Sequence, residues 1–236
     1  MIWLSPICSS LLLVSTATAA TVSGTVELTG SQIPAVSRQK NYSGVVVWLE
    51  STNGPVAPVP RHVEMVQKDK TFRPHVLAIP VGSSVDFPNY DPIFHNAFSN
   101  YSGQLFDVGL YPPGSTRKVV FKREGVVRVF CNIHQSMSAV IVVLRSSYYA
   151  VSRKNGTWSI PDVPAGSYVL HVYHERATDA TLASLTRKIT VGGNDVKEPP
   201  LTISETGYVQ TPHSNKFGKE YPQAPDELST YPGAKK

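Results

Sequence analysis

Residues 130–138 read Phe-Cys131-Asn-Ile-His134-Gln-Ser-Met137-Ser, and this stretch governs the interpretation of the whole chain. It places a thiol, an imidazole and a thioether at the spacing Cys-x2-His-x2-Met. All three groups are donors to soft or borderline metal ions. The motif therefore predicts a metal-binding loop rather than an ordinary turn.

A strand–loop–strand frame surrounds this motif. Val127, Val129 and Cys131 alternate along the chain, so they share one face of a predicted strand. Residues 139–144 are apolar throughout, as expected for a strand buried on both faces. Upstream, His95 follows a turn-rich stretch and opens another predicted strand. We expect the short loop to deliver three donors to one point and His95 to complete the set.

The donor set selects the metal. Two imidazoles and a thiolate in a plane, with a long axial thioether, describe a blue-copper site. We therefore expect one copper ion, cycling between Cu(I) and Cu(II), bound by His95, Cys131, His134 and Met137. Two alternatives remain open: a buried core cysteine with unrelated His and Met, and zinc, which prefers more thiolates or imidazoles.

Residues 61–145 resemble the cupredoxins of the amicyanin and plastocyanin type. The resemblance rests on Val85-Asp-Phe87-Pro-Asn89, His95-Asn96 and Gly125-Val-Val-Arg-Val-Phe-Cys131, in that order. It implies a Greek-key β-sandwich and the same four copper ligands. Gln135 departs from the pattern, because amicyanin-like loops carry Pro there. The wider stretch 25–205 resembles methylamine utilisation proteins that combine a plastocyanin-like and a carboxypeptidase-regulatory-like domain.

Other residues around the predicted centre receive supporting roles. We expect Asn96 to hydrogen-bond across to the Cys131 loop and Asn89, with Asp91, to cap the loop before His95. An apolar rim should form the docking surface at the copper end. Its predicted members are Pro92, Ile93, Phe94, Ile133 and Gln135.

Composition and targeting signals point to a secreted all-β protein. Charged residues make up 17% of the 236 residues and the chain carries 19 prolines, which excludes a coiled coil. Residues 1–19 read as a signal peptide, with an uncharged N-terminal membrane anchor as the alternative. Cys8 lies within it, so the mature chain keeps Cys131 alone and has no disulfide framework. No later stretch is apolar enough to span a membrane, and a bacterial periplasm fits best.

The chain divides into several predicted segments. After the signal peptide come N-terminal strands at 20–60, a copper domain at 61–147, a second sandwich at 148–205 and an extended or disordered tail at 206–236. The second sandwich resembles the transthyretin or carboxypeptidase-regulatory-like fold, through Asn155-Gly-Thr-Trp-Ser-Ile and Pro164-Ala-Gly-Ser-Tyr. We favour residues 20–60 as its first half, with the copper domain inserted. In the simpler alternative they are extra strands on the copper domain. The one weak helical pattern, 176–187, is interpreted as a loop.

Two classes of function fit these features. The first is a one-electron carrier between redox partners. The second is a copper chaperone or sensor. An enzyme is not expected, because no Ser/His/Asp signature and no second His cluster is present. The net charge of +5 and a basic hairpin around Lys122 and Arg123 favour an acidic redox partner. Nucleic acid is not expected, since no aromatic residues interleave with the basic ones.

Overall fold

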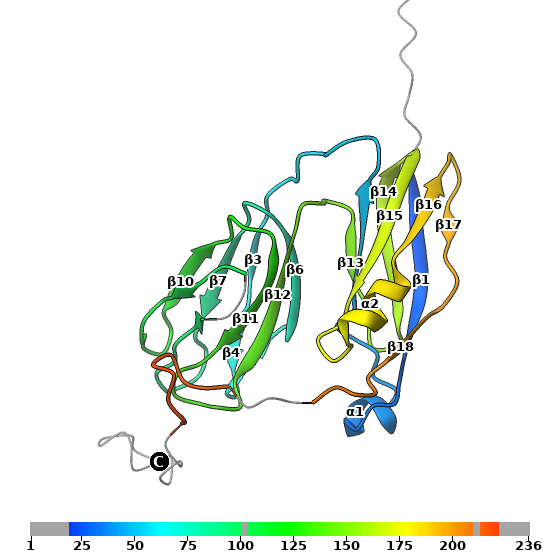
Figure 1. The fold of residues 1–236 in the computed structure, drawn as a ribbon. Coiled ribbons are helices and arrows are strands. Elements are labelled where there is room, and N and C mark those ends of the chain that lie inside the picture. Colours follow the sequence, from blue (N-terminus) through cyan, green and yellow to red (C-terminus); the bar gives the residue numbers. More distant parts are fainter. Residues whose placement is uncertain (1–18, 101–102, 210–212, 222–236) are drawn as a thin grey trace, which may run out of the picture.

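The computed structural model describes residues 19–100, 103–209 and 213–221, which form an almost entirely β structure (Figure 1). Two short helices interrupt it, α1 (Pro34–Ser37) and α2 (Asp179–Leu185). The predicted all-β class with two sandwiches is confirmed. The predicted signal peptide lies outside the described residues except for Ala19, which starts the first strand. None of the helices described here has the length and apolarity needed to cross a bilayer.

Sandwich I contains the predicted metal-binding loop and consists of strands β3 to β12. One sheet has the order β10-β7-β3 and the other β6-β12-β11-β8-β9, while β4 and β5 form a separate hairpin. The strands are β3 (His62–Glu64), β4 (Val66–Lys68), β5 (Thr71–Arg73), β6 (Val76–Pro80), β7 (Ser84–Pro88), β8 (Phe98–Ser99), β9 (Phe106–Asp107), β10 (Thr116–Val120), β11 (Gly125–Phe130) and β12 (Ser138–Leu144).

The hairpin β11–β12 positions the metal-binding loop. The two strands pair antiparallel in unbroken register from Gly125↔Val143 to Phe130↔Ser138. Val127 and Val129 face the core of sandwich I together with Cys131, as the alternation predicted. The loop therefore begins where the pairing ends, at one fixed end of the sandwich.

Sandwich II is built from both ends of the chain. Strand β1 pairs with β14, and β2 pairs with β13 and β15, so the N-terminal strands belong to the same two sheets as the C-terminal ones. Its strands are β1 (Ala19–Thr29), β2 (Val46–Ser51), β13 (Tyr149–Val151), β14 (Thr157–Pro164), β15 (Gly166–Tyr173), β16 (Arg187–Val191), β17 (Val196–Lys197) and β18 (Leu201–Ser204). Sandwich I thus lies in sequence between β2 and β13.

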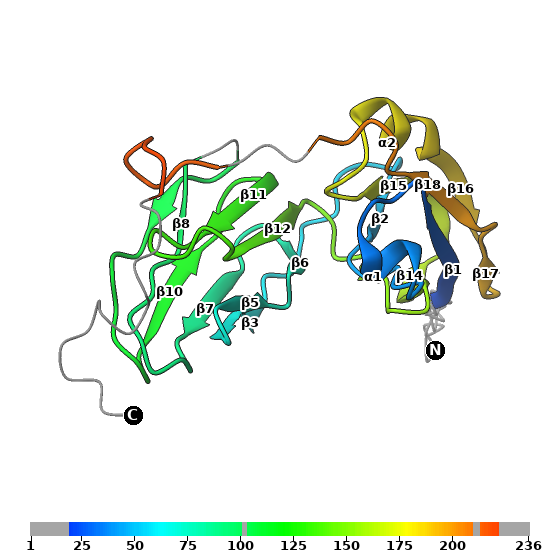
Figure 2. The same ribbon diagram turned by 90° about the horizontal axis from the view of Figure 1, so that it is seen from below.

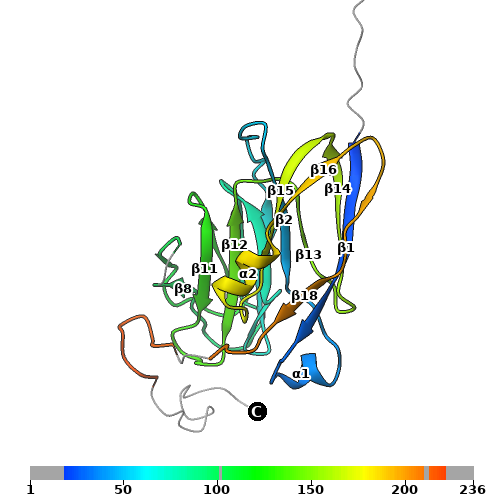
Figure 3. The same ribbon diagram turned by 45° about the vertical axis from the view of Figure 1, so that its right-hand side comes forward.

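The two sandwiches pack side by side through a third apolar cluster (Figures 2 and 3). Strands β6 and β12 of sandwich I face β2, β13 and β15 of sandwich II across it. Its buried members are Val46, Val76, Ala78, Val140, Val142 and Leu144. Because Ala139, Ile141 and Val143 face the opposite core, both faces of β12 are buried, in agreement with its continuous apolar sequence.

Two segments differ from the sequence-based predictions. Residues 179–185 form a helix rather than a loop, and the Thr178 side chain caps it by accepting a hydrogen bond from the Thr181 N–H. The tail after residue 205 has no regular structure where it is described. Its residues 213–221, however, lie against the lower end of sandwich I (Figure 1, orange to red). This part of the tail therefore contacts the folded protein instead of extending away from it.

Candidate metal centre

Three predicted ligands meet at the end of sandwich I. The Cys131 sulfur lies 3.8 Å from Nδ1 of His95 and 3.9 Å from Nδ1 of His134. The three donor atoms all lie within 4.8 Å of one another. Cys131 and His95 are fully buried, whereas His134 is half-buried. Met137 is fully buried in the same core cluster as Cys131.

The loop from Cys131 to Met137 is closed by its own backbone. The Cys131 N–H donates to the Met137 carbonyl at 3.2 Å, and the Met137 N–H donates to the His134 carbonyl at 3.0 Å. These bonds continue the β11–β12 pairing into the loop. They fix the spacing of Cys131, His134 and Met137 along the loop.

His95 is held by its backbone and its ring. Its N–H and carbonyl pair with those of Tyr111, at 3.2 and 2.9 Å. Its Nε2–H donates to the Asp91 carboxylate at 2.7 Å. Because the proton occupies Nε2, the lone pair of Nδ1 faces the Cys131 sulfur. A carboxylate that fixes the tautomer of a histidine ligand in this way is a recurring feature of metal sites.

The protonation states suit metal binding near neutral pH. Burial lowers the pKa of both imidazoles, and the nearby His95 and Lys70 contribute to bringing the pKa of His134 to about 4. Burial works to raise the pKa of Asp91, but hydrogen bonds from the Lys70 N–H, His95 and the Asp69 N–H outweigh it and leave the pKa below its usual value. Both imidazoles are therefore neutral and Asp91 is ionised.

The Cys131 thiol experiences opposing influences. Burial raises its pKa, while hydrogen bonds from the backbone N–H groups of Ile133, His134 and Asn96 lower it. These donors are oriented to stabilise a thiolate. A cation between the sulfur and the two imidazoles would offset the cost of burying that charge.

The donor spacing can be compared with simple coordination geometry. With about 2.3 Å to sulfur and about 2.05 Å to nitrogen, a planar site separates the two atoms by about 3.8 Å, and a tetrahedral site by about 3.6 Å. The observed separations of 3.8 and 3.9 Å are close to both values, so one ion could contact the sulfur and both imidazoles. One thiolate and two imidazoles are the donor set that blue copper prefers.

Asn89 and Asn96 both support the His95 segment, one of them differently from expectation. Asn89 accepts from the Asp91 N–H and donates to the Ile93 carbonyl, so it organises the loop before His95. Asn96 does hydrogen-bond across to Cys131, but it does so through its backbone N–H. Its side-chain amide donates to Asp107 on β9 and to the Gly109 carbonyl just beyond that strand.

The predicted docking rim is only partly apolar and exposed. Pro92 and Gln135 are exposed, Phe94 is 37% exposed, and Ile93 and Ile133 are half-buried. Tyr90 and Leu110 are more exposed, at 60% and 56%, and immediately precede Asp91 and Tyr111. Neither was predicted, because an isolated exposed apolar residue carries no sequence signal.

The basic hairpin lies away from this rim. Its turn at Lys122 and Arg123 precedes β11, whereas Cys131 follows the last residue of that strand. A strand of this length spans about 20 Å. That exceeds the screening length of about 8 Å at physiological salt. The turn of the hairpin therefore does not form part of the surface around the three donors, whereas Arg117 at the other end of β10 lies over the Tyr111 ring.

Comparisons with known proteins give partial matches. No family model matches the chain. It is 39% identical over 59 residues, 25% of its length, to the methylamine utilization protein MauL of Methylorubrum extorquens, and it spans about half the length of that curated relative. Among solved structures it is similar to a purple cupredoxin from Nitrosopumilus maritimus (26% identity, 35% of this chain and 99% of the other, TM-score 0.33). It is also similar to a copper-containing nitrite reductase from Thermus scotoductus (23% identity, 50% of this chain and 28% of the other, TM-score 0.34). A reduced mutant of amicyanin is similar as well (16% identity, 42% of this chain and 98% of the other, TM-score 0.34).

Proposed function

We propose that this protein binds one copper ion through His95, Cys131, His134 and Met137 and acts as a one-electron carrier. The observation that carries the proposal is the triangle of one thiol and two neutral imidazoles, closed at 3.8 and 3.9 Å around a buried sulfur. Bound copper would supply the one-electron couple. The chain supplies the donors and fixes their positions.

The surroundings of the donors favour a carrier over a chaperone. Cys131 and His95 are fully buried, and the backbone bonds of the loop already hold the donors in place. Such a site retains its ion and rearranges little when the charge changes. His134 alone among the three is half-exposed, and it provides the shortest route for an electron from the surface.

The partner is proposed to be a redox protein that docks over His134. Weak redox encounters bury less than about 1,200 Å², which suits a small rim. We also propose that the partner is acidic, because this chain carries a net charge of +5. Added salt would screen the attraction between the two proteins, so the rate of electron transfer between them should fall. The signal peptide predicted at residues 1–19 supports the proposal of a periplasmic location.

The visible spectrum of the copper-loaded mature protein tests the ligand set. We expect an intense thiolate-to-copper band, which Cys131→Ser should abolish because the thiolate is its source. Met137→Leu should keep the band and raise the potential, because loss of a weak axial donor favours Cu(I). Met65→Leu is the matched control, since Met65 is equally buried in the same core but outside the loop. A band that survives Cys131→Ser would refute the assignment.

A paired measurement separates the carrier from the chaperone or sensor. A carrier should exchange electrons quickly and lose copper slowly to a chelator. Ile133→Glu places a charge beside His134 and should slow electron exchange without changing the spectrum. Ser136→Glu, one exposed residue beyond Gln135, is the matched control. Fast copper transfer with sluggish redox cycling would identify a chaperone.

We propose, in addition, that residues 61–147 are a copper module inserted into a carboxypeptidase-regulatory-like sandwich. The pairing of β1 with β14 and of β2 with β15 supports this arrangement. The 61–147 fragment should then bind copper alone. It should also self-associate, because the apolar face of β6 and β12 loses its cover. A fragment that fails to fold in the presence of copper would count against the module boundaries.

A further inference from the structure

We propose that residues 213–221 form a strap that positions both ligand segments of the metal centre. The inference rests on the proposed function and adds positioning residues to it, chiefly Tyr221, His213 and Lys216. In Figure 1 this segment, orange to red, lies along the end of sandwich I that carries the metal-binding loop. Nothing in its composition identified it as part of the site.

The strap has a defined local structure. Asn215 organises a turn in which its side-chain oxygen accepts from the N–H groups of Phe217 and Lys219, at 2.9 and 3.1 Å. Its carbonyl accepts from the Gly218 N–H at 2.9 Å. Gly218 has a φ of +73°, which glycine adopts without strain. The turn fixes the direction of Lys216 on one side and Tyr221 on the other.

Three hydrogen bonds attach the strap to the metal-binding loop. The Tyr221 hydroxyl donates to the Cys131 carbonyl at 2.8 Å, and His213 Nε2–H donates to the Gln135 carbonyl at 2.8 Å. The Lys216 N–H donates to the Asn132 side-chain oxygen at 3.0 Å. These acceptors lie on both sides of His134. The strap therefore restrains the part of the loop that carries the half-exposed ligand.

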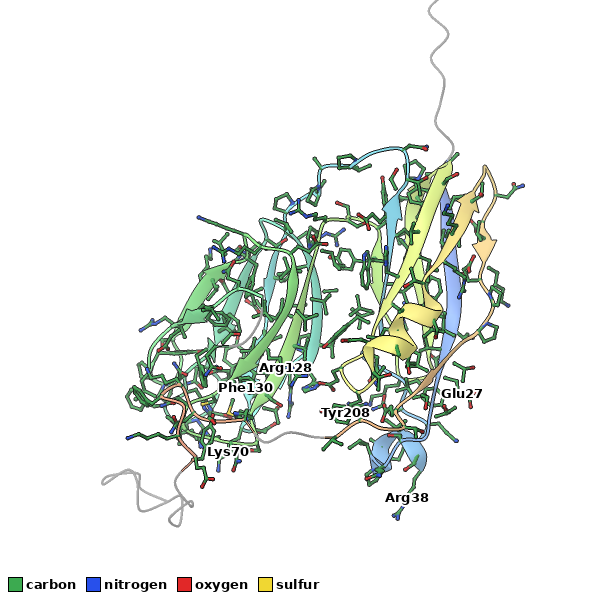
Figure 4. All side chains as sticks on the ribbon, viewed as in Figure 1. Glu27, Arg38, Lys70, Arg128, Phe130 and Tyr208 are labelled. Carbon is green, nitrogen blue, oxygen red and sulfur yellow. The ribbon has the colours of Figure 1, made fainter. Side chains whose placement is uncertain are left out.

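Aromatic packing adds to these bonds. The His213 ring stacks on Phe130 with 4.0 Å between centroids, and Tyr221 meets His213 edge-on at 5.2 Å. Phe130 directly precedes Cys131, and Figure 4 labels it at this end of β11. The stack thus anchors the strap to the strand from which the cysteine ligand leaves.

The strap also reaches the segment that carries His95. Lys216 Nζ forms an ion pair with Asp107 at 2.8 Å, and the other oxygen of Asp107 accepts from the Asn96 amide at 2.8 Å. Asn96 follows His95 and donates its backbone N–H to the Cys131 sulfur. One short segment is therefore linked to both sides of the metal centre, which the sandwich otherwise supplies from separate strands.

The test uses two conservative variants of the full-length protein. Tyr221→Phe removes one hydroxyl, and Lys216→Met removes one charge. Their controls are Tyr208→Phe, outside the strap, and Lys219→Met, at an exposed position of its turn. In the metal-free protein, exchange of the Cys131 and Met137 amide hydrogens should accelerate about fivefold in the Tyr221 variant, as for loss of one hydrogen bond. The controls should match the wild type.

In the copper-loaded protein the same variants should change properties of the centre. Loss of copper to a chelator should accelerate by a similar factor. The reduction potential and the thiolate-to-copper band should also shift. A strap that only packs against the surface would change neither the potential nor the band. If the wild type shows the band but both variants match their controls, the strap proposal is overturned and the proposed function stands. If the wild type binds no copper but loop exchange responds, the proposed function fails and the strap remains a clamp on the loop.

Discussion

Replacing Asp91 with asparagine tests how this carboxylate controls the protonation of His95. One Asp91 oxygen accepts from the Asp69 N–H at 2.6 Å, and the other accepts from the Lys70 N–H at 2.9 Å and from His95 Nε2 at 2.7 Å. Asparagine keeps one acceptor oxygen and introduces an NH2 donor. In either orientation, this donor faces at least one N–H group that it cannot satisfy.

The two orientations of the new amide have different consequences. If the NH2 faces the Asp69 N–H, one partly buried donor loses its acceptor, at a cost of about 1 kcal/mol. If it faces His95, the imidazole must accept through Nε2 and carry its proton on Nδ1, the atom that faces Cys131. That tautomer cannot bind a metal through Nδ1. Either way, we expect copper affinity to fall by about 10- to 100-fold, as for other partners of metal ligands.

Competition titration with a chelator measures the affinity, and urea denaturation of the metal-free protein measures the stability. Asp69→Asn is the matched control, since its side chain is 65% exposed and pairs with Arg73 on the surface. It should change the unfolding free energy by less than about 0.5 kcal/mol. An Asp91→Asn protein that retains wild-type affinity and stability would refute the role assigned to this carboxylate.

Two further predictions concern the sandwiches themselves. His75 faces the Ser138 carbonyl with Nδ1 and Glu175 with Nε2. The hydrogen bond to Glu175 raises the pKa of His75 above 6.5. Burial works to raise the pKa of Glu175, but the same hydrogen bond, together with neighbouring positive charges, outweighs it and leaves that pKa below 4.5. The stabilisation lost in His75→Gln should thus be largest between about pH 4.5 and 6.5 and fade as His75 deprotonates at higher pH. It should reach at most about 1 kcal/mol, because the His75 side chain is half-exposed and Arg176 also pairs with Glu175. Urea denaturation that gives a pH-independent loss would contradict this. Gly156→Ala should destabilise sandwich II by more than about 1 kcal/mol, because a Cβ there would lie 2.2 Å from the Val26 carbonyl at a φ of +81°. Gly192→Ala, with open space around it, is the control, and equal denaturation midpoints for the two variants would count against this explanation.

The sequence predicts the closeness of Cys131 and His134 well because the information for it is local. Cys131, His134 and Met137 lie within one turn, and the alternation of Val127 and Val129 sets the face from which the loop leaves. His95 is harder, since its distance to Cys131 depends on sheet pairing, but a His at the start of a strand is a usable signal. The all-β class follows from the same periodicity.

Contacts made over long sequence distances by irregular segments were not predictable. The Asn96 side chain donates to Asp107 on β9, and no local pattern around Asn96 identifies that partner. Tyr221 meets the Cys131 carbonyl from a segment with no periodicity, so no pattern of period two or 3.6 marks it. The distance of the basic turn from the metal centre, by contrast, follows from the direction of β11.

The position of sandwich I within sandwich II has a consequence for the order of folding. Pairing β2 with β13 requires closing a loop of about 100 residues, but the two connecting segments meet where the Val59 N–H donates to Ser147. Once sandwich I is folded, the loop between β2 and β13 contains only about 14 flexible residues. The entropic cost of closing this loop is then lower by about 2 kcal/mol. Sandwich I, with its cysteine and histidine ligands already assembled, should therefore fold first and act as a template on which the two halves of sandwich II close.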